Sequence, residues 1–132
     1  MNPKVKEKYN NYPLKVKTEI LKLRDLILLV ANSDEQIDFL GEELKWGEPS
    51  FLTKSSGSTI RIDWKNNNPN HISIFVNCRT KLISIFKELY PQEFDYIGNR
   101  ELRLPLDQKY SEQKLLKCIE LALKYNLVKN NF

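Results

Sequence analysis

The sequence predicts an α+β fold in which helices cover one face of an antiparallel sheet of about five strands. Two observations support this prediction. Apolar residues repeat at helical spacing before residue 43, and they then alternate with polar residues in several short runs. The runs are joined by turn-forming residues, which favours antiparallel hairpins. The 132 residues form one predicted domain, residues 1–132, because no linker or repeat divides them.

The first predicted helix begins at Pro13, because proline is tolerated where the first backbone N–H groups have no partner. Its apolar residues repeat at spacings typical of a helix that faces a core. They are Val16, Ile20, Leu23, Ile27 and Val30. The pattern Ser33-Asp34-Glu35-Gln36 matches a capping box and predicts a short second helix, which runs through Leu40 and ends at Gly41.

Alternation predicts two strands, over residues 60–65 and 72–77. Residues 66–70 between them are all asparagine or proline, so the two strands should form an antiparallel hairpin. A tighter turn, Ser55-Ser56-Gly57, connects the first strand to an extended segment around Phe51.

A third helix is predicted over residues 82–90, and Pro91 ends it. Another strand spans residues 101–106, where Pro105 indicates a strand end or a sheet edge. Ser111 is suited to cap the last helix. The inner stripe of that helix contains Leu115, Cys118, Ile119, Ala122 and Leu123.

Strand alternation divides the predicted sheet into a core face and an open face. The apolar residues of the core face are Ile60, Ile62, Ile72, Ile74, Leu102 and Leu104. The open face presents Arg61, Asp63, Phe75, Asn77 and Arg103, with Trp46 nearby. Protein interfaces are enriched in arginine and aromatic residues. The leading hypothesis is therefore a small binding or adaptor domain that offers its open face to a protein or a small ligand.

The stretch LKWGEPSF, residues 44–51, combines one of two tryptophans with one of four glycines. Gly47 and Pro49 interrupt the alternation, so the stretch is predicted to form strand, kink and strand, with Trp46 anchoring a core edge. Contact of Trp46 and Glu48 with a ligand is the alternative. Similarly, Gly98-Asn99-Arg100 predicts a tight turn. The alternative makes Arg100 an anion-binding guanidinium.

LKWGEPSF also resembles the YdhG-like family, a bacterial family of unknown function with a frataxin-like fold. The resemblance extends to Asn77-Cys78, to the predicted helix 82–90, to Gly98-Asn99-Arg100 and to the segment 118–123, and it covers about residues 12–125. It implies helices packed on one face of an antiparallel sheet. One branch of the family is regarded as an iron chaperone that serves iron–sulfur cluster assembly. Iron is therefore the one cofactor that the resemblance suggests.

Iron binding of that kind needs carboxylates on one surface, because hard cations prefer oxygen ligands. The candidate metal ligands are Asp34, Asp38 and Glu42, which would follow one another along one side of the predicted second helix. The alternative is a solvated helix face whose acidic residues favour the N-terminal dipole.

The sequence contains few residues or motifs typical of catalysis, which disfavours an enzyme. His71 is the only histidine, and no nucleophile motif or glycine-rich phosphate loop occurs. Cys78 and Cys118 both lie in apolar contexts, so both are predicted to be buried free thiols.

Positive charge is concentrated near the N-terminus, where residues 1–24 contain seven basic and two acidic side chains. This favours a further alternative, a polyanion or nucleic-acid surface, although a solvated helix face explains the pattern more simply and no nucleic-acid motif occurs. The absence of a long apolar segment or leader predicts a cytoplasmic protein without a membrane partner. The candidate contact residues are Trp46, Glu48, Arg61, Phe75, Arg100 and Arg103.

Overall fold

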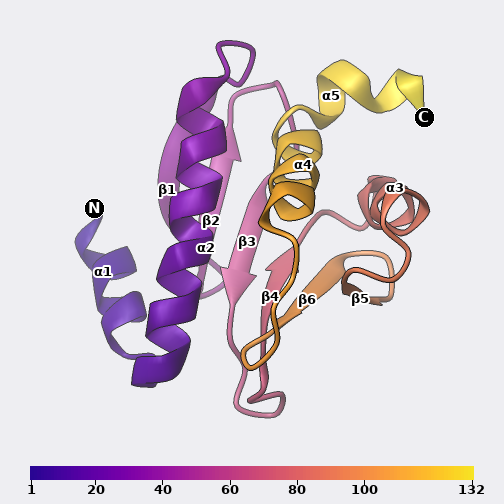
Figure 1. Cartoon of the computed structure of the whole chain (residues 1–132). Coiled ribbons are helices and arrows are strands. Elements are labelled where there is room, and N and C mark those ends of the chain that lie inside the picture. Colours follow the sequence, from indigo (N-terminus) through magenta and orange to yellow (C-terminus); the bar gives the residue numbers. More distant parts are fainter.

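The computed structural model describes all residues, 1–132, and it shows helices packed on one face of a six-stranded antiparallel sheet (Figure 1). The predicted α+β class is therefore confirmed. The strand order across the sheet is β1-β2-β3-β4-β6-β5. The strands are β1 (Phe39–Lys45), β2 (Glu48–Thr53), β3 (Ile60–Asp63), β4 (His71–Phe75), β5 (Asp95–Ile97) and β6 (Glu101–Pro105). The helices are α1 (Pro3–Asn10), α2 (Leu14–Ser33), α3 (Leu82–Leu89), α4 (Glu112–Leu123), α5 (Tyr125–Val128) and the short 3₁₀ helix η1 (Lys129–Asn131).

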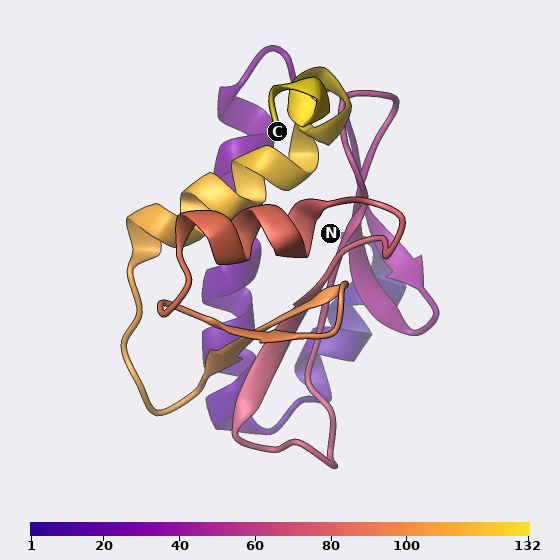
Figure 2. The ribbon, with the colours of Figure 1, turned by 90° about the vertical axis from the view of Figure 1, so that its right-hand side faces the viewer.

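The core lies between the sheet and helices α2, α3 and α4, as a view of the molecule from its side also shows (Figure 2). All six apolar residues predicted for the core face of the sheet are buried. Helix α2 starts after Pro13, as predicted, and four of its five predicted core residues are buried, while Val30 is half-buried. The Ser111 hydroxyl caps α4 by accepting a hydrogen bond from the Lys114 amide at 3.2 Å. No helix in the structure is both long enough and apolar enough to cross a membrane.

The turn between β2 and β3 closes the C-terminal end of α4. The Ser56 hydroxyl donates to the Leu123 carbonyl at 3.0 Å, and the Ser58 amide donates to the Ala122 carbonyl at 2.9 Å. These contacts satisfy carbonyls that a helix end leaves without partners. A Cβ on Gly57 would lie 2.2 Å from the Leu123 backbone, so only glycine allows the turn to approach this closely.

The predicted short helix over residues 33–40 is wrong. Ser33 is instead the last residue of α2, and the Asp34 side chain accepts a hydrogen bond from the Gln36 amide at 2.9 Å in a turn. Strand β1 follows from Phe39 and contains a bulge at residues 39–41, where Gly41 has φ +128°. The capping-box residues therefore lie at the end of one helix and do not begin another. The segment that follows pairs with β2, and this pairing holds it in the extended conformation of a strand.

LKWGEPSF forms a tight hairpin in which Lys45 pairs with Glu48. The two turn residues, Trp46 with φ 57° and Gly47 with φ 75°, both lie in the left-handed region that this kind of turn requires. The predicted sequence of strand, kink and strand is confirmed, and Phe51 is fully buried. The predicted core anchor is wrong, because Trp46 is 90% exposed at the tip of the hairpin.

Two elements and one thiol differ from the prediction. Helix α1 begins at Pro3 and lies beside β1 (Figure 1). The Asn2 side chain caps it by accepting a hydrogen bond from the Lys4 amide at 2.9 Å. Strand β5 lies at the sheet edge and makes β6 an internal strand, with Pro105 at its end as one of the two alternatives predicted. Cys118 is buried as predicted, but Cys78 is exposed because it lies in the loop after β4.

Candidate binding face of the sheet

The register of the central strands gathers most of the predicted contact residues on the open face, the side of the sheet opposite the helices. Arg61 pairs with Phe75, and Phe75 pairs with Glu101. One step along the strands, Ser73 pairs with Arg103. Residues directly opposite one another on neighbouring strands point to the same side of a sheet. Arg61, Phe75 and Arg103 therefore share one surface that spans β3, β4 and β6.

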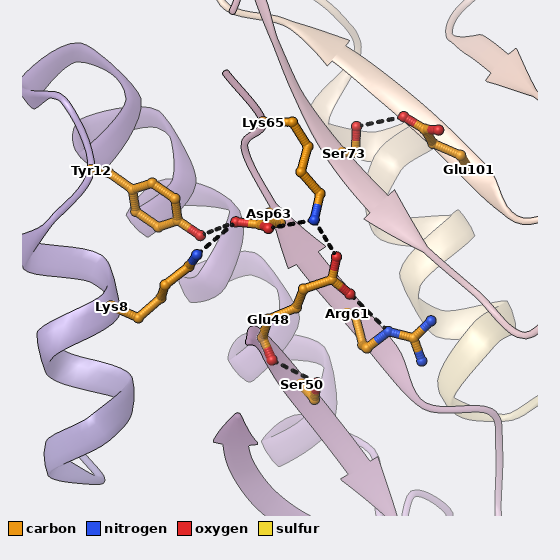
Figure 3. A network of polar contacts seen from close by, with 9 residues as sticks. All are labelled: Lys8, Tyr12, Glu48, Ser50, Arg61, Asp63, Lys65, Ser73 and Glu101. Carbon is orange, nitrogen blue, oxygen red and sulfur yellow. Dashed lines mark hydrogen bonds and ion pairs between the residues drawn. The ribbon is translucent and has the colours of Figure 1, made fainter. Parts of the chain in front are cut away.

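Asp63 is the most deeply buried carboxylate of this region, with 3% of its side chain exposed. The Tyr12 hydroxyl donates to its Oδ1 at 2.5 Å, and the Lys8 ammonium lies 3.5 Å from the same oxygen (Figure 3). The Lys65 ammonium lies 3.0 Å from Oδ2. Burial and the hydrogen bond to Asp63 raise the pKa of Tyr12 far above its usual range, so this phenol stays protonated as a donor.

Glu48 is linked to the same network through Lys65. Backbone pairing between β2 and β3 extends only over Ser50–Arg61 and Phe51–Ile60, so side chains connect the strands beyond it. Lys65 Nζ lies 2.9 Å from Glu48 Oε2, and Arg61 Nε donates to Oε1 at 3.0 Å (Figure 3). Burial alone would lower the pKa of Lys65, but its bonds to Glu48 and Asp63 outweigh burial and raise it. Lys65 is therefore a permanent positive bridge between two carboxylates.

A second carboxylate holds the other arginine in the same manner. Arg103 Nε donates to Glu101 Oε2 at 2.7 Å, and the Ser73 hydroxyl donates to that oxygen at 2.8 Å. In both arginines the Nε–H binds the protein's own carboxylate. The terminal nitrogens of Arg61 have no partner within the chain and point away from Glu48 (Figure 3). The carboxylate tether orients this guanidinium while its outer edge stays free.

Phe75 lies between these groups and is half-buried. The Lys65 ammonium is 5.9 Å from the centre of its ring, within the range of a cation–π contact. An aromatic ring flanked by fixed guanidinium groups is a combination that protein interfaces favour. The open face can therefore bind a partner by apolar contact on Phe75 and by hydrogen bonds from the arginines.

Trp46 and Arg100 do not join this group. Trp46 lies on the β1–β2 turn and Arg100 on the turn between β5 and β6, and β1 and β5 are opposite edges of the sheet. The two turns also lie at opposite ends of the antiparallel strands, so these residues occupy diagonally opposite corners. Gly98 has φ 61°, which confirms the predicted turn. Arg100 is exposed and its side chain has no partner.

The three candidate metal ligands do not form one surface, because the helix expected to align them is absent. Asp34 lies 2.9 Å from the Lys124 ammonium. Asp38 accepts hydrogen bonds from the Ser56 and Ser55 amides at 2.9 and 3.0 Å, and such bonds hold its pKa below the usual range. Glu42 accepts from the Tyr9 hydroxyl at 2.6 Å and from Arg24 Nε at 2.8 Å. The structure contains no group of three or more side chains able to hold a metal ion.

The basic N-terminal segment is partly neutralised within the chain. Lys8 pairs with Asp63, Lys22 with Glu19, and Arg24 with Glu42. These pairings reduce the free positive charge that a polyanion surface would need.

Sequence reasoning placed Asp63 on the open face and named Glu48 as a candidate contact, but it missed Glu101 and the ion pairs that these carboxylates make with the arginines and Lys65. Strand alternation placed Asp63 on this face, and the same alternation in β4 and β6 would have added Ser73 and Glu101. The contributions of Lys8 and Tyr12 had no such signal, since they come from α1 and the loop after it. Comparison of the chain with models of protein families, with curated proteins and with solved structures finds no match. The resemblance to the YdhG-like family thus stays a prediction.

Proposed function

We propose that the protein is a small cytoplasmic binding domain whose open face takes an extended, carboxylate-bearing segment of a partner protein. The observation that carries this proposal is the tethering of Arg61 by Glu48 and of Arg103 by Glu101 on either side of the half-buried Phe75. Both tethers use Nε.

A guanidinium fixed in this way loses little conformational freedom on binding, and lower ordering cost favours affinity. Its outer edge can donate two parallel hydrogen bonds to a carboxylate, which a lysine cannot do. Phe75 adds an apolar surface beside it. A matching partner segment therefore contains an aspartate or glutamate next to an apolar side chain.

Selection from a displayed library of random peptides tests this proposal. The immobilised protein should enrich peptides that combine an acidic residue with a neighbouring apolar one. Arg61→Lys keeps the positive charge beside Glu48 but cannot donate two parallel hydrogen bonds to a carboxylate. It should therefore reduce the affinity for these peptides about tenfold. Phe75→Ala should reduce the affinity by a similar factor, because the apolar contact is lost.

Arg79→Lys is the matched control, because Arg79 is exposed in the loop after β4 and its guanidinium makes no hydrogen bond or ion pair, its backbone amide alone donating to Asn77. It should leave peptide affinity unchanged. The proposal fails if no peptide is enriched, or if the enriched peptides bind the Arg61→Lys and Phe75→Ala proteins as tightly as the parent.

A further inference from the structure

A hollow of about 500 Å³ opens at the β5 edge of the sheet, beside the C-terminal half of α3. This side of the molecule faces the viewer in Figure 2. Cationic or imidazole side chains from three elements line the hollow: His71 of β4, Lys87 of α3 and Arg103 of β6. Asp95 is the only carboxylate in the lining. Its volume lies within the range of pockets that bind small molecules.

The polar groups of the hollow are oriented by Asn68. The Asn68 amide satisfies both of its neighbours when its nitrogen donates to His71 Nδ1 at 3.2 Å and its oxygen accepts from Arg103 Nη1 at 3.3 Å. That oxygen also lies 3.1 Å from Arg103 Nε, whose hydrogen it shares with Glu101. Because Nδ1 then accepts, a neutral His71 carries its proton on Nε2. Nε2 lies 3.9 Å from Asp95 Oδ2, which is beyond hydrogen-bond distance, so it can donate to a ligand. Lys87 is exposed, and its ammonium has no partner within the chain.

The apolar wall of the hollow is fixed in place by hydrogen bonds and ring contacts. The Tyr96 hydroxyl donates to the carbonyls of Tyr90 at 2.7 Å and Phe86 at 3.2 Å, at the end of α3. The Phe94 ring meets the Tyr96 ring edge to face, with centroids 6.4 Å apart. Pro91 and Ile97 complete the apolar lining. A ligand that fits this hollow therefore has both a negative group and an apolar part.

We propose that this hollow is a binding site for a small phosphate monoester. Lys87 provides an ammonium without a partner in the chain, and Arg103 provides a guanidinium whose Nε is already paired with Glu101 at 2.7 Å. Asp95 opposes these charges in part, and His71 provides a hydrogen bond from Nε2 to the phosphate group. The organic part of the ligand lies against Tyr96, Pro91 and Ile97. The site shares Arg103 with the proposed peptide contact but contains neither Arg61 nor Phe75.

His71 allows a direct test, because it is the only histidine and its ring protons need no assignment. Phenyl phosphate, inorganic phosphate and benzoate, all adjusted to one pH and one ionic strength, would be titrated while the His71 ring protons are followed by NMR. Phenyl phosphate should give a saturable shift with a dissociation constant on the order of 1 mM. Inorganic phosphate lacks the apolar part and benzoate lacks the second charge, so both should bind more weakly.

Lys87→Gln should raise the dissociation constant of phenyl phosphate about tenfold. Lys54→Gln, on the turn between β2 and β3, is the matched control and should bind like the parent. Arg61→Lys should also bind like the parent, which separates this site from the peptide surface. The proposal would be overturned if the phenyl phosphate shift did not saturate, or if benzoate bound as tightly as phenyl phosphate. It would also be overturned if the Lys87→Gln protein bound phenyl phosphate with the same dissociation constant as the parent.

Discussion

Replacement of Tyr12 by phenylalanine removes the hydroxyl that donates to Asp63 at 2.5 Å and changes nothing else in the ring. A hydrogen bond to a charged group contributes about 1.5–3 kcal/mol to stability. Asp63 keeps its contacts with Lys8 and Lys65, so the acceptor is not left without partners. We therefore expect the free energy of unfolding at pH 7 to fall by roughly 2 kcal/mol.

The loss should shrink at alkaline pH. Tyr12 has an ordinary pKa of 10.0, and the folded protein raises it far above this value through burial and the Asp63 contact. Above pH 10 the unfolded chain releases this proton while the folded chain keeps it, so stability falls as the pH rises. At pH 11 this costs the parent about 1.4 kcal/mol, whereas phenylalanine has no proton to lose. The difference between the two proteins should drop to about 0.6 kcal/mol.

Urea unfolding followed by far-ultraviolet circular dichroism at pH 7 and pH 11 measures both quantities. Tyr110→Phe is the control at pH 7, because the Tyr110 hydroxyl has no hydrogen-bond partner, and it should lie within about 0.5 kcal/mol of the parent. An unchanged stability of the Tyr12→Phe protein at pH 7 would refute the role given to this bond. A difference that stays constant between the two pH values would refute the raised pKa.

Three further predictions concern single sites. Gly57→Ala should cost roughly 3 kcal/mol in urea unfolding, because its Cβ would lie 2.2 Å from the Leu123 backbone, and a near-neutral effect would contradict the close approach. Trp46→Asn should stabilise the protein by about 1 kcal/mol, since asparagine adopts the left-handed conformation more readily; a lower melting temperature would argue against strain at this turn. A maleimide should label Cys78 alone in the native protein, as counted by mass spectrometry, because burial raises the pKa of the Cys118 thiol to about 12.

The core could be predicted from the sequence because its signal is local. Alternation within one strand, as in Ile60 and Ile62, determines which face each residue occupies, whatever strand lies beside it. Helical spacing in α2 does the same for Ile20 and Leu23. These patterns are enforced by apolar burial, which dominates folding energetics. All of these residues are buried in the structure.

The segment from Ser33 to Leu40 could not be predicted in this way, because its local and tertiary preferences conflict. Ser33-Asp34-Glu35-Gln36 has the composition of a helix start. The structure instead uses Asp38 to bind the amides of Ser55 and Ser56, which are distant in sequence, and it pairs the following residues with β2. A single-sequence pattern contains no information on such long-range partners.

The open face shows the same division between local and long-range information. Alternation alone identifies Arg61 and Phe75 as neighbours of one surface, so the aromatic and basic character of the face could be predicted. Which nitrogen of Arg61 stays free depends on Glu48, and therefore on β2 lying beside β3. The distinction matters for binding, because a guanidinium tethered through Nε leaves its terminal edge, Nη1 and Nη2, free for a carboxylate, whereas one bound through its terminal nitrogens has that edge occupied. The specificity proposed here thus follows from strand order, and substitution of Glu48 should affect peptide affinity through the orientation of Arg61 even without a contact of its own.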